Sequence, residues 1–214
     1  MEWWRELRDL KPHPLLYTVV AVLMVCWTAW RVHRLRPRLR ALRLGIEGEK
    51  VVGQYLERLR GQEYDVFHDI VGPGFNIDHV LIGPAGIFTI ETKTWSKPNA
   101  GNPRIQCDGE SLTVAGKTPD RSPIVQARAQ ASWLKNLINE STGRSFAVAP
   151  IILFPGWFVE NSPGSLNRIW VLEPKALPAF LEGEPRRLEA SNAKLASFHL
   201  SRFVRTGERE RDAS

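Results

Sequence analysis

The fold is decided by residues 77–93, which read IDHVLIGPAGIFTIETK. Two runs, 77–82 and 87–93, are rich in Ile, Val and Phe and have the length of β-strands. The tetrapeptide between them, Gly-Pro-Ala-Gly, contains residues that favour a tight turn. Because so short a connection joins neighbouring antiparallel strands, the stretch predicts a β-hairpin within a sheet.

Charged side chains stand at one end of this hairpin. Glu91 and Lys93 follow the apolar run 87–90, and because side chains alternate along a strand, both point to the same face. Asp78 begins the preceding strand, so the hairpin can bring its carboxylate beside that of Glu91. Two adjacent carboxylates repel each other unless a cation or a proton lies between them, and a hard divalent metal ion meets this need. An edge-strand salt bridge is the alternative explanation.

The sequence on both sides of the hairpin supplies the rest of a sheet with covering helices. Apolar residues recur at helical spacing in two segments and at strand spacing in five. The predicted helices cover 45–60 and 123–139, and the predicted strands cover 64–70, a short piece around Ile105, 112–114, 146–154 and 169–172. The order α-β-β-β-(hairpin)-α-β-β predicts an α/β or α+β fold.

An uncharged run precedes this domain. Residues 15–30 are 16 consecutive residues without a charge, and Tyr17, Trp27 and Trp30 suit the interfacial belts of a bilayer. As a helix the run spans about 24 Å, against roughly 30 Å of hydrocarbon, and a snorkelling Arg31 extends it to residue 32. We expect one transmembrane helix over 15–32. A cleaved signal peptide and a buried core helix are the alternatives.

The positive charge of the chain is concentrated beside that run. Residues 31–44 contain six arginines and no acid, whereas the remainder carries 23 bases and 23 acids. Arginines after the apolar run argue against cleavage and are typical of a cytoplasmic flank. We expect the 31–43 arginine run to contact anionic lipid headgroups, with the N-terminus outside and the large domain in the cytoplasm. The net charge of +6 is therefore weak evidence for a polyanion partner.

The domain limits follow from these patterns. We expect five segments: a short N-terminal tail over 1–14, the transmembrane helix over 15–32, a stiff basic linker over 33–44, the nuclease-like domain over 45–182, and a C-terminal helix with a polar, disordered tail over 183–214. Two cysteines and five scattered histidines give no zinc-type spacing, so any metal must be held by oxygen. We interpret both cysteines as free thiols in a reducing compartment.

Several motifs resemble the nuclease-related domain (NERD) family, which is similar to restriction-endonuclease-like nucleases. They are Gly45-x-x-Gly48-Glu49, Ile77-Asp78-His79-Val80, the segment 83–93 and Pro123-x-x-Gln126. The resemblance covers roughly residues 45–154 and implies a restriction-endonuclease-like core of order α-β-β-β-α-β. Asp78 followed by Glu91-x-Lys93 matches the PD-(D/E)XK pattern of that superfamily.

The resemblance implies a role for each residue. Asp78 and Glu91 are expected to hold Mg²⁺ or Mn²⁺, and Lys93 to orient or deprotonate the attacking water. Glu49 and Gln126 are expected as accessory residues, with a solvated helix carboxylate and a helix-surface amide as the alternatives. His79 is interpreted as a strand residue and not a ligand. The glycine that often follows the lysine in the family is delayed here by residues 94–98, so we expect a remodelled loop beside the site.

The resulting hypothesis is a membrane-anchored, metal-dependent nuclease that hydrolyses phosphodiester bonds of DNA, the choice of DNA being implied by the resemblance alone. A catalytically inactive nucleic-acid-binding or scaffold domain tethered to the membrane is the alternative from a different class. A membrane-bound interaction protein whose arginine run is functional is a third. The sequence leaves the oligomeric state open.

The topology makes a testable prediction. A reporter fused after Ser214 should be cytoplasmic, because the arginines follow the apolar run and not the reverse. Neutral replacement of the six arginines at 31, 34, 36, 38, 40 and 43 should scramble the orientation. A C-terminal reporter that is active only in an oxidising, external compartment would contradict the assignment.

Overall fold

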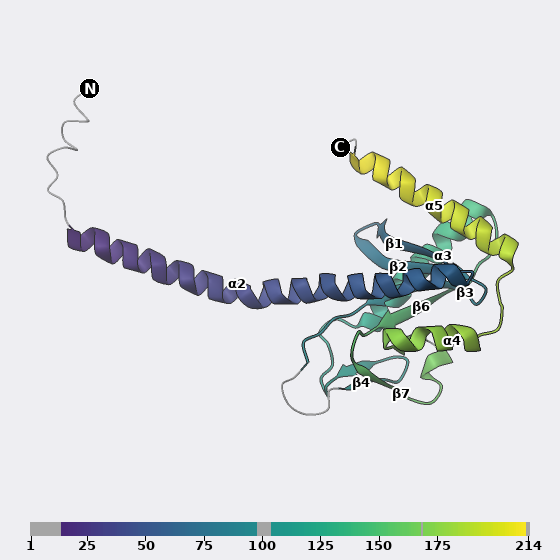
Figure 1. Ribbon diagram of the computed structural model, residues 1–214, viewed down its shortest axis with the longest axis horizontal. Helices are drawn as coiled ribbons and strands as arrows, with labels where there is room; N and C mark the ends of the chain where they lie inside the picture. Colours follow the sequence, from purple (N-terminus) through teal and green to yellow (C-terminus); the bar gives the residue numbers. More distant parts are fainter. Residues whose placement is uncertain (1–13, 98–103, 168, 213–214) are drawn as a thin grey trace, which may run out of the picture. The chain divides into compact units, whose positions relative to one another are not determined.

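The computed structural model describes residues 14–97, 104–167 and 169–212. It divides the chain into two units, Met1–Arg43 and Leu44–Ser214. The elements follow one another as α2 (Pro14–Glu57), η1 (Arg58–Gln62), β1 (Asp65–Gly72), β2 (Phe75–Gly83), β3 (Gly86–Thr92), β4 (Arg104–Cys107), β5 (Leu112–Val114), α3 (Pro123–Thr142), β6 (Val148–Leu153), β7 (Phe158–Asn161), η2 (Ser165–Asn167), β8 (Trp170–Leu172), η3 (Pro174–Ala176), α4 (Leu177–Gly183) and α5 (Ala190–Asp212) (Figure 1). The predicted mixed α/β fold and its order of elements are confirmed.

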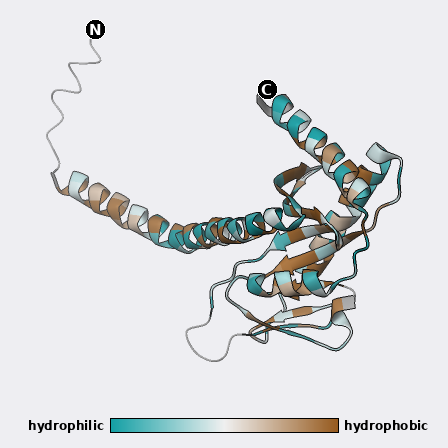
Figure 2. Ribbon diagram, turned by 45° about the vertical axis from the view of Figure 1, so that its right-hand side comes forward, coloured by the Kyte–Doolittle hydropathy of each residue, from teal (hydrophilic) through white to brown (hydrophobic). Residues whose placement is uncertain are grey.

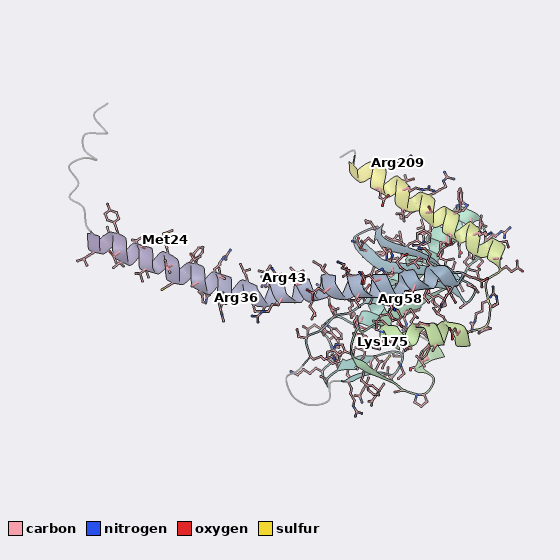
Figure 3. All side chains as sticks on the ribbon, viewed as in Figure 1. Met24, Arg36, Arg43, Arg58, Lys175 and Arg209 are labelled. Carbon is pink, nitrogen blue, oxygen red and sulfur yellow. The ribbon has the colours of Figure 1, made fainter. Side chains whose placement is uncertain are left out.

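The described residues of the first unit, 14–43, belong to α2. Within the described part of the chain, this helix alone is long and apolar enough to cross a membrane, and its apolar side chains are exposed. Figure 2 shows the hydrophobic colouring that runs around its successive turns. Met24 is labelled in this apolar part, and Arg36 and Arg43 in the basic part that follows (Figure 3).

Helix α2 continues without interruption through the basic segment, including Pro37. The sequence predicted a short, stiff basic linker over 33–44, and in the structure these residues belong to α2. The helix persists because arginine, leucine and alanine, which fill this segment, are strong helix formers, while a single proline removes one backbone hydrogen bond.

In the second unit, a five-stranded sheet of order β1-β2-β3-β6-β8 carries the fold. The first three strands are antiparallel neighbours, as the short turns predicted. β6 joins β3 in parallel, with Glu91 beside Ile152, and β8 joins β6 in parallel. A parallel pair needs a long crossover connection, and α3 lies in the connection between β3 and β6.

Helices cover both faces of this sheet. On one face, Val52 and Leu56 of α2 pack in a cluster with Leu81 and Ile90 of the hairpin, together with residues of α4. On the other face, residues of α3 and α5 pack against the sheet through a second cluster. Because both faces are covered, β3 is buried along almost its whole length.

A second, three-stranded sheet of order β5-β4-β7 packs beside the first. Its residues form a third buried cluster with Ile152, Phe154 and Trp157. The predicted hairpin of β4 and β5 is confirmed, but β7 and the short helix α4 were not predicted. Elements of four and seven residues are too short to give a clear periodicity.

The terminal helix corrects one expectation. α5 continues to Asp212, so the charged segment expected to be a disordered tail after residue 204 is helical. Glutamate and arginine, which dominate this segment, are good helix formers, and Phe203 and Val204 join the second cluster immediately before it.

Gly48 on α2 lets the helix approach the end of β3 closely. A Cβ added at Gly48 would lie 2.0 Å from Cγ2 of Thr94, whereas one added at Gly45 would meet Oγ1 of Thr94 at 3.8 Å, an ordinary contact. Only the second glycine of the Gly45-x-x-Gly48 motif is therefore required by packing.

This difference predicts that Gly48→Ala lowers the free energy of unfolding by about 1–2 kcal/mol, because overpacking outweighs the gain of about 1 kcal/mol in helix propensity. Gly45→Ala is the matched control and should be neutral or stabilising. Adding Thr94→Ala to Gly48→Ala should restore stability, measured by chemical denaturation. Equal effects of the two glycine substitutions would contradict the assigned contact.

Candidate active site

The pairing of β2 with β3 brings Asp78 and Glu91 together. His79 pairs with Ile90 in the antiparallel register, and one further step sets Asp78 opposite Glu91. The main chain supports this arrangement, since the amide nitrogen of Thr92 donates to Oδ2 of Asp78 at 2.7 Å. The two carboxylates therefore face each other across neighbouring strands, as the hairpin had suggested.

Glu91 is buried, with 4% of its surface exposed, and its oxygens are held by three side chains. Oε1 accepts from Nζ of Lys93 at 2.5 Å and from Nε2 of Gln126 at 2.7 Å. Oε2 accepts from Nε2 of Gln130 at 2.6 Å. Nζ of Lys93 also donates to Oε1 of Gln126 at 3.0 Å, which closes a triangle of lysine, carboxylate and amide.

Gln126 and Gln130 come from the first turns of α3. Ser122 caps this helix by accepting from the amide nitrogen of Val125, and Pro123 occupies its first turn, where a missing N–H is tolerated. The two glutamines are four residues apart and lie one above the other on one helix face. Gln126 was expected at the site from the family resemblance, whereas Gln130 was not.

Glu49 lies near these residues on α2. Burial raises its pKa first, and the negative charges of Asp69 and Glu91 raise it further. Asp69 was not anticipated: it occupies the place on β1 opposite Asp78, between the pairs His68–His79 and Ile70–Ile77. An exposed acid on a strand gives no signal in the sequence that it belongs to a site.

Burial, followed by the charge of Glu91, raises the pKa of Asp78 to about 7. The hydrogen bond from the amide nitrogen of Thr92 opposes this shift without cancelling it. Asp78 therefore holds a proton more readily than an exposed aspartate, because burial and a neighbouring carboxylate both disfavour its charged form.

The donor set suits a hard divalent cation. The two carboxylates offer oxygen only, which is what Mg²⁺ and Mn²⁺ prefer. Oε1 of Gln130, in a side chain that is 1% exposed, has no hydrogen-bond partner in the described structure, so an electron-rich atom beside Glu91 is left without a donor. Within residues 14–97, 104–167 and 169–212 no three His, Cys, Asp or Glu side chains converge as a complete ligand set. Asp78 and Glu91 would thus share an ion with other oxygen ligands, a common arrangement for Mg²⁺.

His79 points to the opposite face of β2 from Asp78. Its Nδ1 lies 2.7 Å from Nδ1 of His68, whose Nε2 lies 2.8 Å from Oε1 of Glu57 on α2. Burial and the neighbouring His68 lower the pKa of His79 to about 4. His79 is thus a neutral, buried residue between the sheet and α2.

The segment after Lys93 packs against the third buried cluster. Trp95 contacts the ring of Phe154 with a centroid distance of 5.2 Å, and its carbonyl accepts from Nε1 of Trp157 at 3.3 Å. The expected remodelled loop begins here, and its continuation over 98–103 lies outside the described residues. A cavity of about 480 Å³, lined in part by Phe88, Trp170 and Arg187, contains none of the carboxylates described above.

Comparison with known proteins connects this geometry to a family. The family described as "NERD: Nuclease-related domain" matches residues 44–155, which is more than half of the chain and includes all five residues expected at the site. No curated protein matched the chain, and no solved structure did. The NERD family is part of the restriction-endonuclease-like superfamily. The chain belongs to the nuclease-related domain family.

Proposed function

We propose that the chain is a membrane-anchored, metal-dependent nuclease that hydrolyses phosphodiester bonds of DNA. The observation that carries the proposal is the pairing of Asp78 with Glu91 across β2 and β3, with Lys93 bonded to Glu91. Membership of the family indicates a nuclease-related function. The catalytic activity, the metal ion and the DNA substrate are what we propose in addition.

Each residue has a defined task in the proposed reaction. Asp78 and Glu91 hold Mg²⁺ or Mn²⁺, which when bound neutralises phosphate charge and makes a nearby water more acidic. Lys93 lies on the same face as Glu91 and orients the attacking water or takes its proton. Gln126 keeps Lys93 beside the carboxylate, and Glu49 contributes further negative charge. The water oxygen bonds to phosphorus as the phosphorus–oxygen ester bond breaks, giving a phosphomonoester and a hydroxyl group.

The proposal also includes the membrane. The exposed apolar residues of α2 support anchoring through residues 15–32, and the arginines at 31–43 suit contact with anionic lipid headgroups. In this arrangement the nuclease-like domain is cytoplasmic, where Mg²⁺ and nucleic acid are both available.

One observation favours a second candidate, a nucleic-acid-binding or scaffold domain without turnover. Outside residues 31–44 the bases and acids of the chain are equal in number, 23 of each, whereas DNA-binding surfaces are usually basic. Metal-dependent cleavage by the full chain separates the two candidates.

Substitutions should separate the task of Lys93 from that of the two carboxylates. In the detergent-solubilised full chain, Lys93→Ala should reduce Mg²⁺-dependent cleavage of plasmid and single-stranded DNA by about 10²- to 10⁴-fold while Mn²⁺ still binds. Asp78→Asn and Glu91→Gln should weaken both Mn²⁺ binding and cleavage, because each removes a ligand charge. Cleavage rates and Mn²⁺ titrations measure the two effects separately.

Lys135→Ala, a change of an exposed lysine on α3, is the matched control and should cleave like the unmodified chain. Cleavage by Lys93→Ala at the unmodified rate would remove the lysine from the site. Metal binding that is unaffected by both carboxylate changes would favour the binding domain over the nuclease.

The raised pKa of Asp78 leads to a further prediction. A carboxyl group whose pKa rises from 3.8 to about 7 on folding binds protons more tightly in the folded state, so stability is lost as the pH rises through about 7. In EDTA at pH 8, Asp78→Asn should therefore be more stable than the unmodified chain, by about 1–3 kcal/mol, and this difference should vanish near pH 4.

Adding Mg²⁺ at pH 8 should reverse the order, because the ion stabilises the charged pair and not the asparagine variant. Thermal unfolding with and without Mg²⁺ measures both effects, and Asp65→Asn, on β1 and away from the carboxylate pair, serves as the control. An Asp78→Asn variant that is less stable at pH 8 in EDTA would contradict the assigned electrostatics.

A further inference from the structure

Gln130 lies between the two strands that carry the carboxylates. Its Nε2 donates to Oε2 of Glu91 on β3 at 2.6 Å and to the main-chain carbonyl of Asn76 on β2 at 2.9 Å. Asn76 is two residues before Asp78 on the same strand. One amide therefore ties the position of Glu91 to the strand of its partner carboxylate.

The packing of α3 gives no reason for an amide at this position. Gln130 is 1% exposed, and its helix neighbours Ala127, Ala131 and Leu134 are buried apolar residues. A buried amide is unfavourable unless it is fully hydrogen-bonded, and Oε1 of Gln130 has no partner in the described structure. An apolar side chain would fill the helix–sheet layer but would leave Oε2 of Glu91 without this donor, so the amide serves the carboxylate.

The orientation of the amide follows from its partners. Both the carboxylate oxygen of Glu91 and the carbonyl oxygen of Asn76 are acceptors, so the nitrogen must face them. Gln126 differs from Gln130 in two ways: it is exposed, and it bonds to Oε1 of Glu91, the oxygen that Lys93 also uses. Oε1 therefore has both of its acceptor positions filled, whereas Oε2 keeps one open beside Gln130.

We propose that Gln130 is a positioning residue that fixes the rotation of the Glu91 carboxylate, so that Oε2 is presented to the divalent metal ion and Oε1 to Lys93. This inference rests on the proposed function, since it assumes that Glu91 is a metal ligand. Gln130 acts through Glu91 and does not itself contact substrate. Groups that orient a ligand in this way typically change metal affinity by about 10- to 100-fold.

The test measures Mn²⁺ binding to the full chain in detergent by the electron paramagnetic resonance signal of the free ion. Gln130→Met keeps the length of the side chain and removes both hydrogen bonds, and it should weaken Mn²⁺ binding by about 10- to 100-fold. In a Glu91→Gln background, titrated at millimolar Mn²⁺, the same substitution should have little further effect, because the residue acts through Glu91. If Gln130→Met does not fold, Gln130→Asn, which is one methylene shorter, should give the same loss.

Gln54→Met is the matched control, since Gln54 is an exposed glutamine on α2, and it should bind Mn²⁺ like the unmodified chain. Affinity of Gln130→Met within twofold of the unmodified chain would overturn the positioning role and leave the proposed function intact. An equal loss in the Glu91→Gln background would also overturn it, by showing a merely structural effect. Failure of the unmodified chain to bind Mn²⁺ would remove the proposed metal site, and this inference with it.

Discussion

The burial of the Glu91 carboxylate is the constraint on which the rest of the site depends. A carboxylate that is 4% exposed is unfavourable in a protein interior unless hydrogen bonds and an opposite charge compensate it. Lys93 supplies the charge, and Gln126 and Gln130 supply amide donors. For these amides to reach Glu91, the N-terminal turns of α3 must cross the end of β3. In the chain α3 lies between β3 and β6, and the parallel pairing of these two strands is compatible with that crossing.

Asp78 is also a largely buried carboxylate, but within the described residues it does not have the side-chain donors that compensate the burial of Glu91. One main-chain amide donates to it, and burial, followed by the neighbouring charge of Glu91, raises its pKa to about 7. Electrostatic strain is thus concentrated on one member of the pair. A divalent cation would relieve it, so the same feature that opposes folding at high pH favours metal binding. The opposite face of β2 shows no such conflict, because the buried His79 has a lowered pKa and stays neutral.

The elements predicted from the sequence were those that local patterns determine. Alternation and turn residues over 77–93 gave the hairpin, and with it the approach of Asp78 and Glu91, because an antiparallel register with a short turn leaves few choices. The length of α5 was missed, because the glutamates and arginines near its end are good helix formers although the segment has the composition of a polar tail. The other residues of the site are brought there by tertiary contacts. No local pattern in the sequence marks Gln130 or Asp69 as neighbours of the carboxylates.

The spacing of Gln126 and Gln130 has a physical meaning that appears only in three dimensions. Residues four apart on a helix lie about 6 Å from each other on one face, so their amides can reach the two oxygens of a single carboxylate. A spacing of two would send one amide away from β3. The second glutamine of the pair is buried because α3 runs into the layer between helix and sheet, while the first remains at the open edge beside Lys93. The two oxygens of Glu91 are therefore held differently: Oε1 is bonded to Lys93 and to the exposed Gln126, and Oε2 is bonded to the buried Gln130.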